Sequence, residues 1–193
     1  MRDERLQNVA AAGLVIGALL GMAGTVAPTA GLRGLAWGID GTALVVASAL
    51  LGVHHLRRGN SQLAAGFLVF LAGETLILSG SAMELAASTP TLAAGVGLWS
   101  AALALISTSP VIPGFVRVTG VIAAILFAVT AALIFGGAGL TPLSQPLPFY
   151  GFPFLAVTLV GWAWVHRRPM TQRGASGPHE WSGARAAQSA LEW

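Results

Sequence analysis

The sequence predicts an all-α, polytopic integral membrane protein, a bundle of six transmembrane helices with both termini on the cytoplasmic side. Three observations lead to this fold class: the composition, the number of long apolar runs, and the distribution of arginine. Of the 193 residues, 55% are hydrophobic and only 9% are charged, whereas an ordinary soluble domain has about 25% charged residues. With so few charges to cover a water-exposed surface, most of the chain must be solvated by lipid.

Six apolar runs, each long enough to cross a bilayer, follow one another along the chain. They cover about residues 9–27, 35–56, 62–85, 92–109, 116–137 and 149–166, the predicted spans of one domain over residues 1–168. Proline, glycine and polar residues separate them. We expect the first run to be a retained span and not a cleaved signal, because its leader has no net charge and it exceeds the usual signal length of about 7–15 apolar residues. Residues 169–193 are polar and predicted to be a disordered cytoplasmic tail.

The arginines predict the orientation of the bundle. All ten basic residues are arginine, and with six spans only Arg33 falls on one side of the membrane. The nine others share the opposite side: Arg2, Arg5, Arg57, Arg58, Arg117, Arg167, Arg168, Arg173 and Arg185. The positive-inside rule places those nine in the cytoplasm. Because the arginines flank apolar runs instead of forming one stripe, we expect no nucleic-acid partner, and the composition indicates a bacterial inner membrane.

Glu74 is the most informative residue, since it lies about twelve residues into the third span, near the bilayer midplane. Insertion scales put an acid at that depth at about 2.5–3.5 kcal/mol, so it is expected to have a partner, a wet cavity or a function. A carboxyl in such a place can relay protons or couple them to a substrate. The alternative is a neutral acid that is hydrogen-bonded to a neighbouring helix.

Two more acids and one arginine are candidates for the outer mouth of the bundle. Asp40 shares a helical face with Arg33, seven residues earlier, which suggests an internal ion pair; in the alternative, Arg33 reaches the interface and Asp40 stays hydrated. Glu84 continues a stripe of Gly66, Gly73 and Gly80 at the outer end of the third span. Asp40 and Glu84 together would make the mouth acidic, unless Glu84 is simply a solvated helix end.

Glycines at helical spacing predict close packing, because small residues let helix backbones approach in lipid. Gly13, Gly17 and Gly21 form such a stripe on the first span, and Gly66, Gly73 and Gly80 form the second. Each stripe is suited either to packing within the chain or to assembly with another copy or another membrane protein.

Histidines and an internal similarity give weaker signals. His54, His55 and His166 fall at the cytoplasmic ends of spans two and six, where headgroup-level residues are ordinary; only His54 with His166 is placed to ligate a haem. Residues 66–76 resemble residues 151–159, which suggests a 3+3 inverted repeat of the kind found in transporters.

The sequence leaves the function open between two classes. The first is a proton- or cation-coupled transporter or permease that uses Glu74, and the second is a non-catalytic accessory protein that assembles through the glycine faces. With no cysteine and no nucleotide-binding, metalloprotease or hydrolase motif, we expect neither a cofactor nor a metal, and an enzyme is the least supported class.

Overall fold

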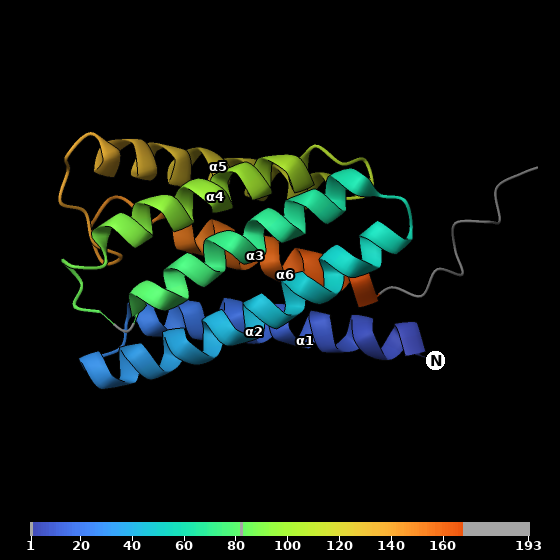
Figure 1. The fold of residues 1–193 in the computed structure, drawn as a ribbon, viewed down its shortest axis with the longest axis horizontal. Coiled ribbons are helices and arrows are strands. Elements are labelled where there is room, and N and C mark those ends of the chain that lie inside the picture. The colour runs from blue at the N-terminus through green and yellow to red at the C-terminus, as the bar shows by residue number, and fades with distance from the viewer. Residues whose placement is uncertain (1, 82, 168–193) are drawn as a thin grey trace, which may run out of the picture.

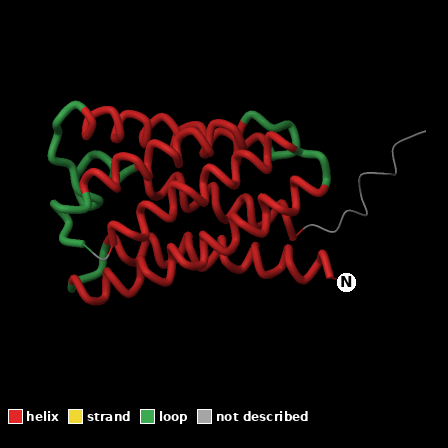
Figure 2. Tube along the Cα trace, viewed as in Figure 1, coloured by secondary structure: helices red, strands yellow, loops and turns green. Residues whose placement is uncertain are grey.

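The computed structural model describes residues 2–81 and 83–167, and these form six α-helices joined by turns and loops, with no strand among them (Figures 1 and 2). The predicted tail, residues 169–193, lies outside the described residues. The helices are α1 (Arg2–Thr25), α2 (Ala30–Arg57), α3 (Ser61–Ser81), α4 (Thr89–Ser107), α5 (Gly114–Phe135) and α6 (Gly151–Arg167). The all-helical prediction is confirmed. Five helices, α1 to α5, are long and apolar enough to cross a membrane; α6 has 17 residues, or about 26 Å of helix.

Local sequence explains several helix boundaries. The Thr29 side chain accepts a hydrogen bond from the Leu32 amide at 3.3 Å and starts α2. At the end of α2, Gly59 has φ of +73°, and the amides of Gly59 and Asn60 donate to the carbonyls of Leu56 and His55. Only glycine adopts this left-handed conformation at no steric cost, so the turn to α3 is set by that residue.

The six helices pack as a closed ring. Each helix contacts its two neighbours in the chain, and α1 contacts α6 to close the ring. Neighbouring helices run in opposite directions, so the N-terminus and the end of α6 lie at the same end of the molecule (Figure 1). This end also carries Arg5, Arg57, Arg58, Arg117 and Arg167, and we call it the arginine-rich end.

The ring order argues against the inverted repeat that the sequence suggested. Superposing α1–α3 on α4–α6 would map each helix onto the one three places further round, which runs in the opposite direction. A two-fold axis in the membrane plane reverses direction but also reverses the order of helices round the ring. No rotation therefore relates the two halves, so the match between residues 66–76 and 151–159 is not the mark of an inverted repeat.

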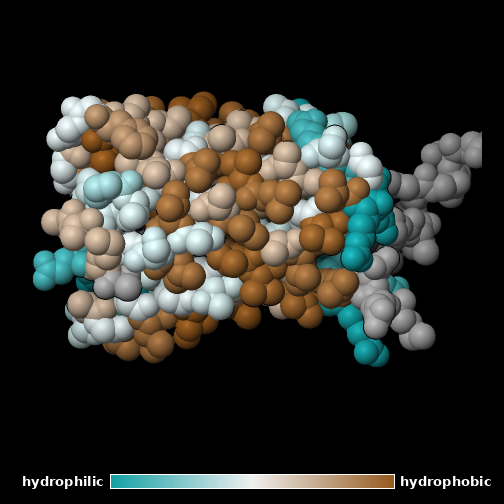
Figure 3. Space-filling view, in the orientation of Figure 1, coloured by the Kyte–Doolittle hydropathy of each residue, from teal (hydrophilic) through white to brown (hydrophobic). Residues whose placement is uncertain are grey.

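Apolar side chains cover both the inside and the outside of the ring. Exposed large hydrophobic side chains occur on all six helices, including Leu19, Val46, Leu68, Leu105, Ile125 and Val160. They form an apolar belt between two more polar ends (Figure 3), as expected of a surface in contact with lipid. Inside the ring, Phe67 and Phe70 of α3 meet Trp162 of α6 with ring centroids 5.2 and 5.7 Å apart, so aromatic contacts link these two helices.

Candidate functional site

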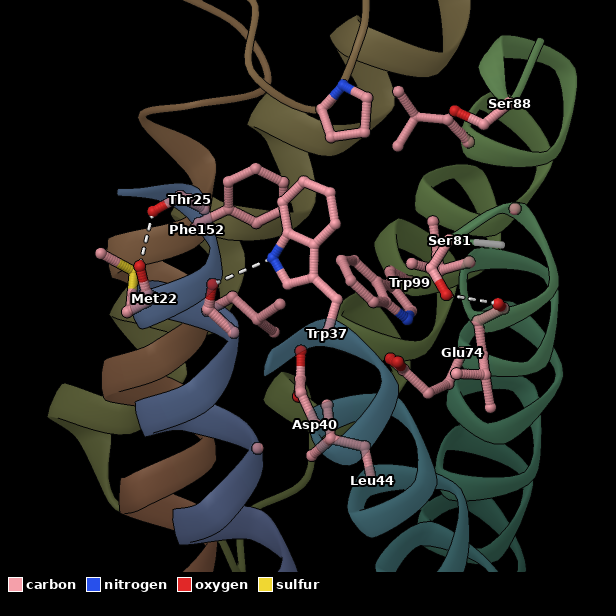
Figure 4. A pocket seen from close by; sticks show the side chains of 18 of the residues that line it. Met22, Thr25, Trp37, Asp40, Leu44, Glu74, Ser81, Ser88, Trp99 and Phe152 are labelled. Carbon is pink, nitrogen blue, oxygen red and sulfur yellow. Dashed lines mark hydrogen bonds between the residues drawn. The ribbon is translucent and has the colours of Figure 1, made fainter. Parts of the chain in front are cut away.

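A cavity of about 90 Å³ lies inside the ring, toward the end opposite the arginine-rich end. All helices except α5 contribute to its wall, and Pro142 of the loop between α5 and α6 also lines it. Most of the lining is apolar, but Asp40 from α2 and Glu74 from α3 both reach it (Figure 4). A space of this size accommodates a few water molecules, because about 10–15 Å³ of such space is enough for one.

Glu74 is sealed from the outside of the protein. Its side chain is 1% exposed, and its Oε2 has no hydrogen-bond partner within the chain. Figure 4 shows the indole nitrogen of Trp99 turned toward the carboxyl, yet this Nε1 forms no hydrogen bond of ordinary geometry. Glu74 therefore reaches the cavity with at least one oxygen free for water, a proton or a cation.

A close approach of α2 makes room for this carboxyl. A Cβ atom at Gly41 would lie 3.2 Å from Oε1 of Glu74 and 2.9 Å from Cδ1 of Leu78. Such distances are too short for a methyl group without movement of the neighbours. Glycine at position 41 is thus what lets α2 and α3 approach each other beside the acid.

Asp40 lies against the glycine stripe of α1. Cβ atoms at Gly17 and Gly21 would meet the carboxyl oxygens of Asp40 at 3.1 and 2.9 Å. Oδ1 of Asp40 has no hydrogen-bond partner, and the charges of Asp40 and Glu74 act on each other across the cavity. The two acids were predicted separately from the sequence, and the structure brings them to one site.

The ion pair considered for Asp40 and Arg33 is not formed. The Arg33 guanidinium instead lies 6.0 Å from the ring of Trp37, near the outer limit for a cation–π contact. Trp37 in turn donates from Nε1 to the carbonyl of Gly21 at 3.3 Å and links α2 to α1. Two helical turns proved too long for the pair, because the aromatic ring between the two residues offers Arg33 a nearer contact.

Glu84 is not part of the site. Helix α3 ends at Ser81, so Glu84 lies in the following connection, where its side chain is exposed and does not line the cavity. The prediction that Glu84 continues the glycine stripe is wrong, because it assumed four more residues of helix. The carbonyl of Glu84 accepts a hydrogen bond from the Ser88 amide at 2.9 Å within that connection.

Both glycine stripes face helices of the same chain. Gly13, Gly17 and Gly21 pack against Ala43, Leu44 and Asp40 of α2. Gly66, Gly73 and Gly80 pack against α4, where a Cβ at Gly73 would lie 2.8 Å from the carbonyl oxygen of Gly95. These faces therefore serve packing within the ring.

A pair of buried histidines near the arginine-rich end was missed by the sequence reasoning. Nε2 of His55 lies 2.9 Å from Nε2 of His166, and Nδ1 of His166 lies 2.7 Å from the carbonyl oxygen of Trp162. His54, which the sequence paired with His166, instead contacts Gln7 at 3.0 Å. The spacing of Leu44, Ser48, Leu51 and His55 on one face of α2 was the signal that His55, and not His54, faces inward.

The fold and surface fit the class of polytopic helical membrane proteins. Comparison with protein-family models, curated proteins and solved structures finds no match for this chain. Within residues 2–81 and 83–167, no group of three or more histidine, aspartate or glutamate side chains is placed to hold a metal ion. The chemistry available at the cavity is that of two carboxyls in an apolar enclosure, which can exchange protons or bind a small cation.

Proposed function

We propose that this protein is a small proton- or cation-coupled transporter or channel-like permease, with Glu74 and Asp40 as its binding site. In this proposal α6 is the sixth span, both termini are cytoplasmic, and the membrane is a bacterial inner membrane. The orientation is supported by the arginine-rich end, which the positive-inside rule assigns to the cytoplasm. The cavity then faces the outer side.

The observation that carries the proposal is the Glu74 carboxyl, buried to 1% exposure in mid-helix with an unpartnered oxygen at a cavity. An acid inside a membrane domain is costly, and an acid with an unsatisfied oxygen is more so. The indole of Trp99 on the neighbouring helix α4 faces this carboxyl, but a purely structural acid would be expected to have both oxygens hydrogen-bonded, and Oε2 has no partner.

Asp40 explains how the site would select its ligand. Two ionised carboxylates beside one small apolar cavity repel each other strongly, because little water screens them. A proton or a small cation between them removes that repulsion. Loading and release of one positive charge is therefore the event that the site is suited to perform.

The accessory-protein alternative needs a surface for partners, and the glycine faces on which it relied are covered by α2 and α4. It would have to use the lipid-facing belt. We therefore favour transport, and the experiment below separates the two proposals.

The test is flux into proteoliposomes that contain the purified protein and a pH-sensitive dye, under an imposed potential, with Na⁺ and K⁺ compared as cations. We expect Glu74→Gln, which keeps the side-chain shape, to lower the flux at least tenfold, and Asp40→Asn to lower it less. Glu84→Gln is the matched control, because the same change at an exposed acid leaves the cavity intact, and its flux should equal that of the wild type. Flux unchanged by Glu74→Gln, or no flux of any of these ions through the wild type, would refute the proposal and favour the accessory role.

A further inference from the structure

Eight buried side-chain polar atoms of the described residues have no protein partner, and all but Arg33 Nε and Ser107 Oγ belong to residues that line the cavity or follow it along α2 and α6. Besides Asp40 Oδ1 and Glu74 Oε2 they include Trp99 Nε1, Ser48 Oγ, Trp162 Nε1 and His55 Nδ1. All six atoms are close to fully buried, yet none of them forms a hydrogen bond of ordinary geometry within the described part of the chain. Native proteins normally satisfy such groups, and where the chain does not, ordered water does.

The order of these atoms along the helices traces a line through the ring. On α2, Leu44 lines the cavity, Ser48 follows one turn later, and His55 lies two turns beyond Ser48. Ser48 is 0% exposed. The face of α2 that meets α1 carries Ala43 and Ala47, and Gly52 meets α3, so the Ser48 face lies between these contacts and looks inward.

Helix α6 repeats this order on the opposite wall. Leu155 and Leu159 line the cavity, Trp162 comes next, and His166 follows one turn later. The Trp162 indole nitrogen thus lies at a depth between the cavity and the histidine pair. Helix α3 gives the distance between the histidine pair and the cavity. Its Phe67 stacks on His55 at 5.6 Å, and its Glu74 lies seven residues, or about 10 Å, further along the helix.

We propose that Ser48, Trp162 and Trp99 bind a file of water molecules that connects the Asp40–Glu74 cavity with the His55–His166 pair, and that protons move along this file. The inference rests on the proposed function and deepens it, because it names the proton as the ion and gives its path through the ring. The aromatic side chains of Phe67 and Phe70 keep the file narrow, so larger solutes are excluded.

The histidine pair suits the inner end of such a path. The carbonyl of Trp162 only accepts hydrogen bonds, so His166 Nδ1 donates to it and His166 Nε2 accepts from His55 Nε2–H. That leaves His55 Nδ1 as a free acceptor. A proton that arrives there makes His55 a cation, and the Nε2 proton can then pass to His166 Nε2, which leaves His55 neutral and His166 charged.

The charged groups around this pair favour rapid release over storage. His54 of α2 and Arg58, the residue that follows α2, act on His55 with like charge, and His54 also acts on His166. The residues of α3 and α6 that pack against His55 are Phe67, which is uncharged, and His166, the other member of the pair. These positive groups disfavour a proton on the pair, so the pair passes a proton on instead of storing it.

An isosteric pair of variants at Ser48 tests the water file. Ser48→Val and Ser48→Thr add the same volume, and only the threonine keeps a hydroxyl. In the proteoliposome assay we expect Ser48→Val to lower proton flux at least tenfold relative to Ser48→Thr, and Ser79→Ala, at an exposed hydroxyl that bonds to the Leu76 carbonyl, to match the wild type. Equal flux through Ser48→Val and Ser48→Thr would overturn the inference.

A second measurement needs no variant to fold. Radiolytic hydroxyl-radical labelling modifies side chains next to bound water, and we expect Trp162 and His55 in the wild type to be modified well above Phe127, which is equally buried but has no unpartnered polar atom. Absence of labelling at Trp162 and His55 would overturn the water file. If Glu74→Gln stops the flux while Trp162 is unlabelled, the proposed function stands and the file is rejected; if Trp162 is labelled but Glu74→Gln has no effect, the proposed function fails.

Discussion

At the scale of single residues, depth in the membrane was a better guide to the site than spacing along the helix. Glu74 was predicted from its depth alone, and the structure places it at a cavity. The partner of Asp40 could not be predicted, because spacing on one helix suggested Arg33 while the actual neighbours, Gly17 and Gly21, belong to another helix. Sequence periodicity gives the face of a residue but not which helix covers that face.

The histidine pair allows a prediction at this scale. Because a carbonyl cannot donate, His166 should be the Nδ1–H tautomer and His55 the Nε2–H tautomer at neutral pH. Nitrogen-15 NMR of histidine-labelled protein in micelles distinguishes the two forms, and Trp162→Phe serves as a control that keeps the backbone carbonyl. Finding the Nε2–H tautomer at His166 would contradict the hydrogen-bond network on which the proton path depends.

At the scale of helices, the apolar runs predicted the number of elements and most of their extent. The predicted third span ran to residue 85, but α3 ends at Ser81. The prediction was too long because the residues after Ser81 continue the apolar composition, without a proline or glycine to mark the end of the helix. Which surfaces the glycine stripes cover was left open by the sequence. The structure answers this because α2 lies along the first stripe and α4 along the second.

The α3–α4 contact gives a stability prediction. In Gly73→Ala the new methyl group would lie 2.8 Å from the Gly95 carbonyl oxygen and 2.9 Å from Trp99 Cδ1. We expect a loss of about 1–3 kcal/mol in the free energy of unfolding, as for other overpacked sites. Gly38→Ala is the matched control within a helix, because nothing lies within 4 Å of its Cβ position, and it should be neutral or stabilise the helix by up to about 1 kcal/mol. Thermal unfolding in detergent measures both, and equal melting temperatures would contradict the assigned packing.

At the scale of the whole molecule, the ring determines which motions are available. A transporter built from inverted halves alternates access by rocking one half against the other, but the ring order leaves no such halves. In the transport that we propose, access to the cavity would then change locally. The loop between α5 and α6 is the candidate for this change, since its Pro142 lines the cavity and its Leu140 carbonyl accepts a hydrogen bond from Thr89 Oγ1 at 3.4 Å.

The orientation of the ring in the membrane gives the last prediction, and the absence of cysteine from the chain makes it simple to test. Asn60 and Ala87 are both exposed and lie in connections at opposite ends, Asn60 between α2 and α3 and Ala87 between α3 and α4. If the arginine-rich end is cytoplasmic, a membrane-impermeant maleimide should label Ala87→Cys in intact cells and Asn60→Cys only after permeabilisation. The reverse pattern would place the Asp40–Glu74 cavity on the cytoplasmic side, and labelling of both in intact cells would contradict the spanning ring itself.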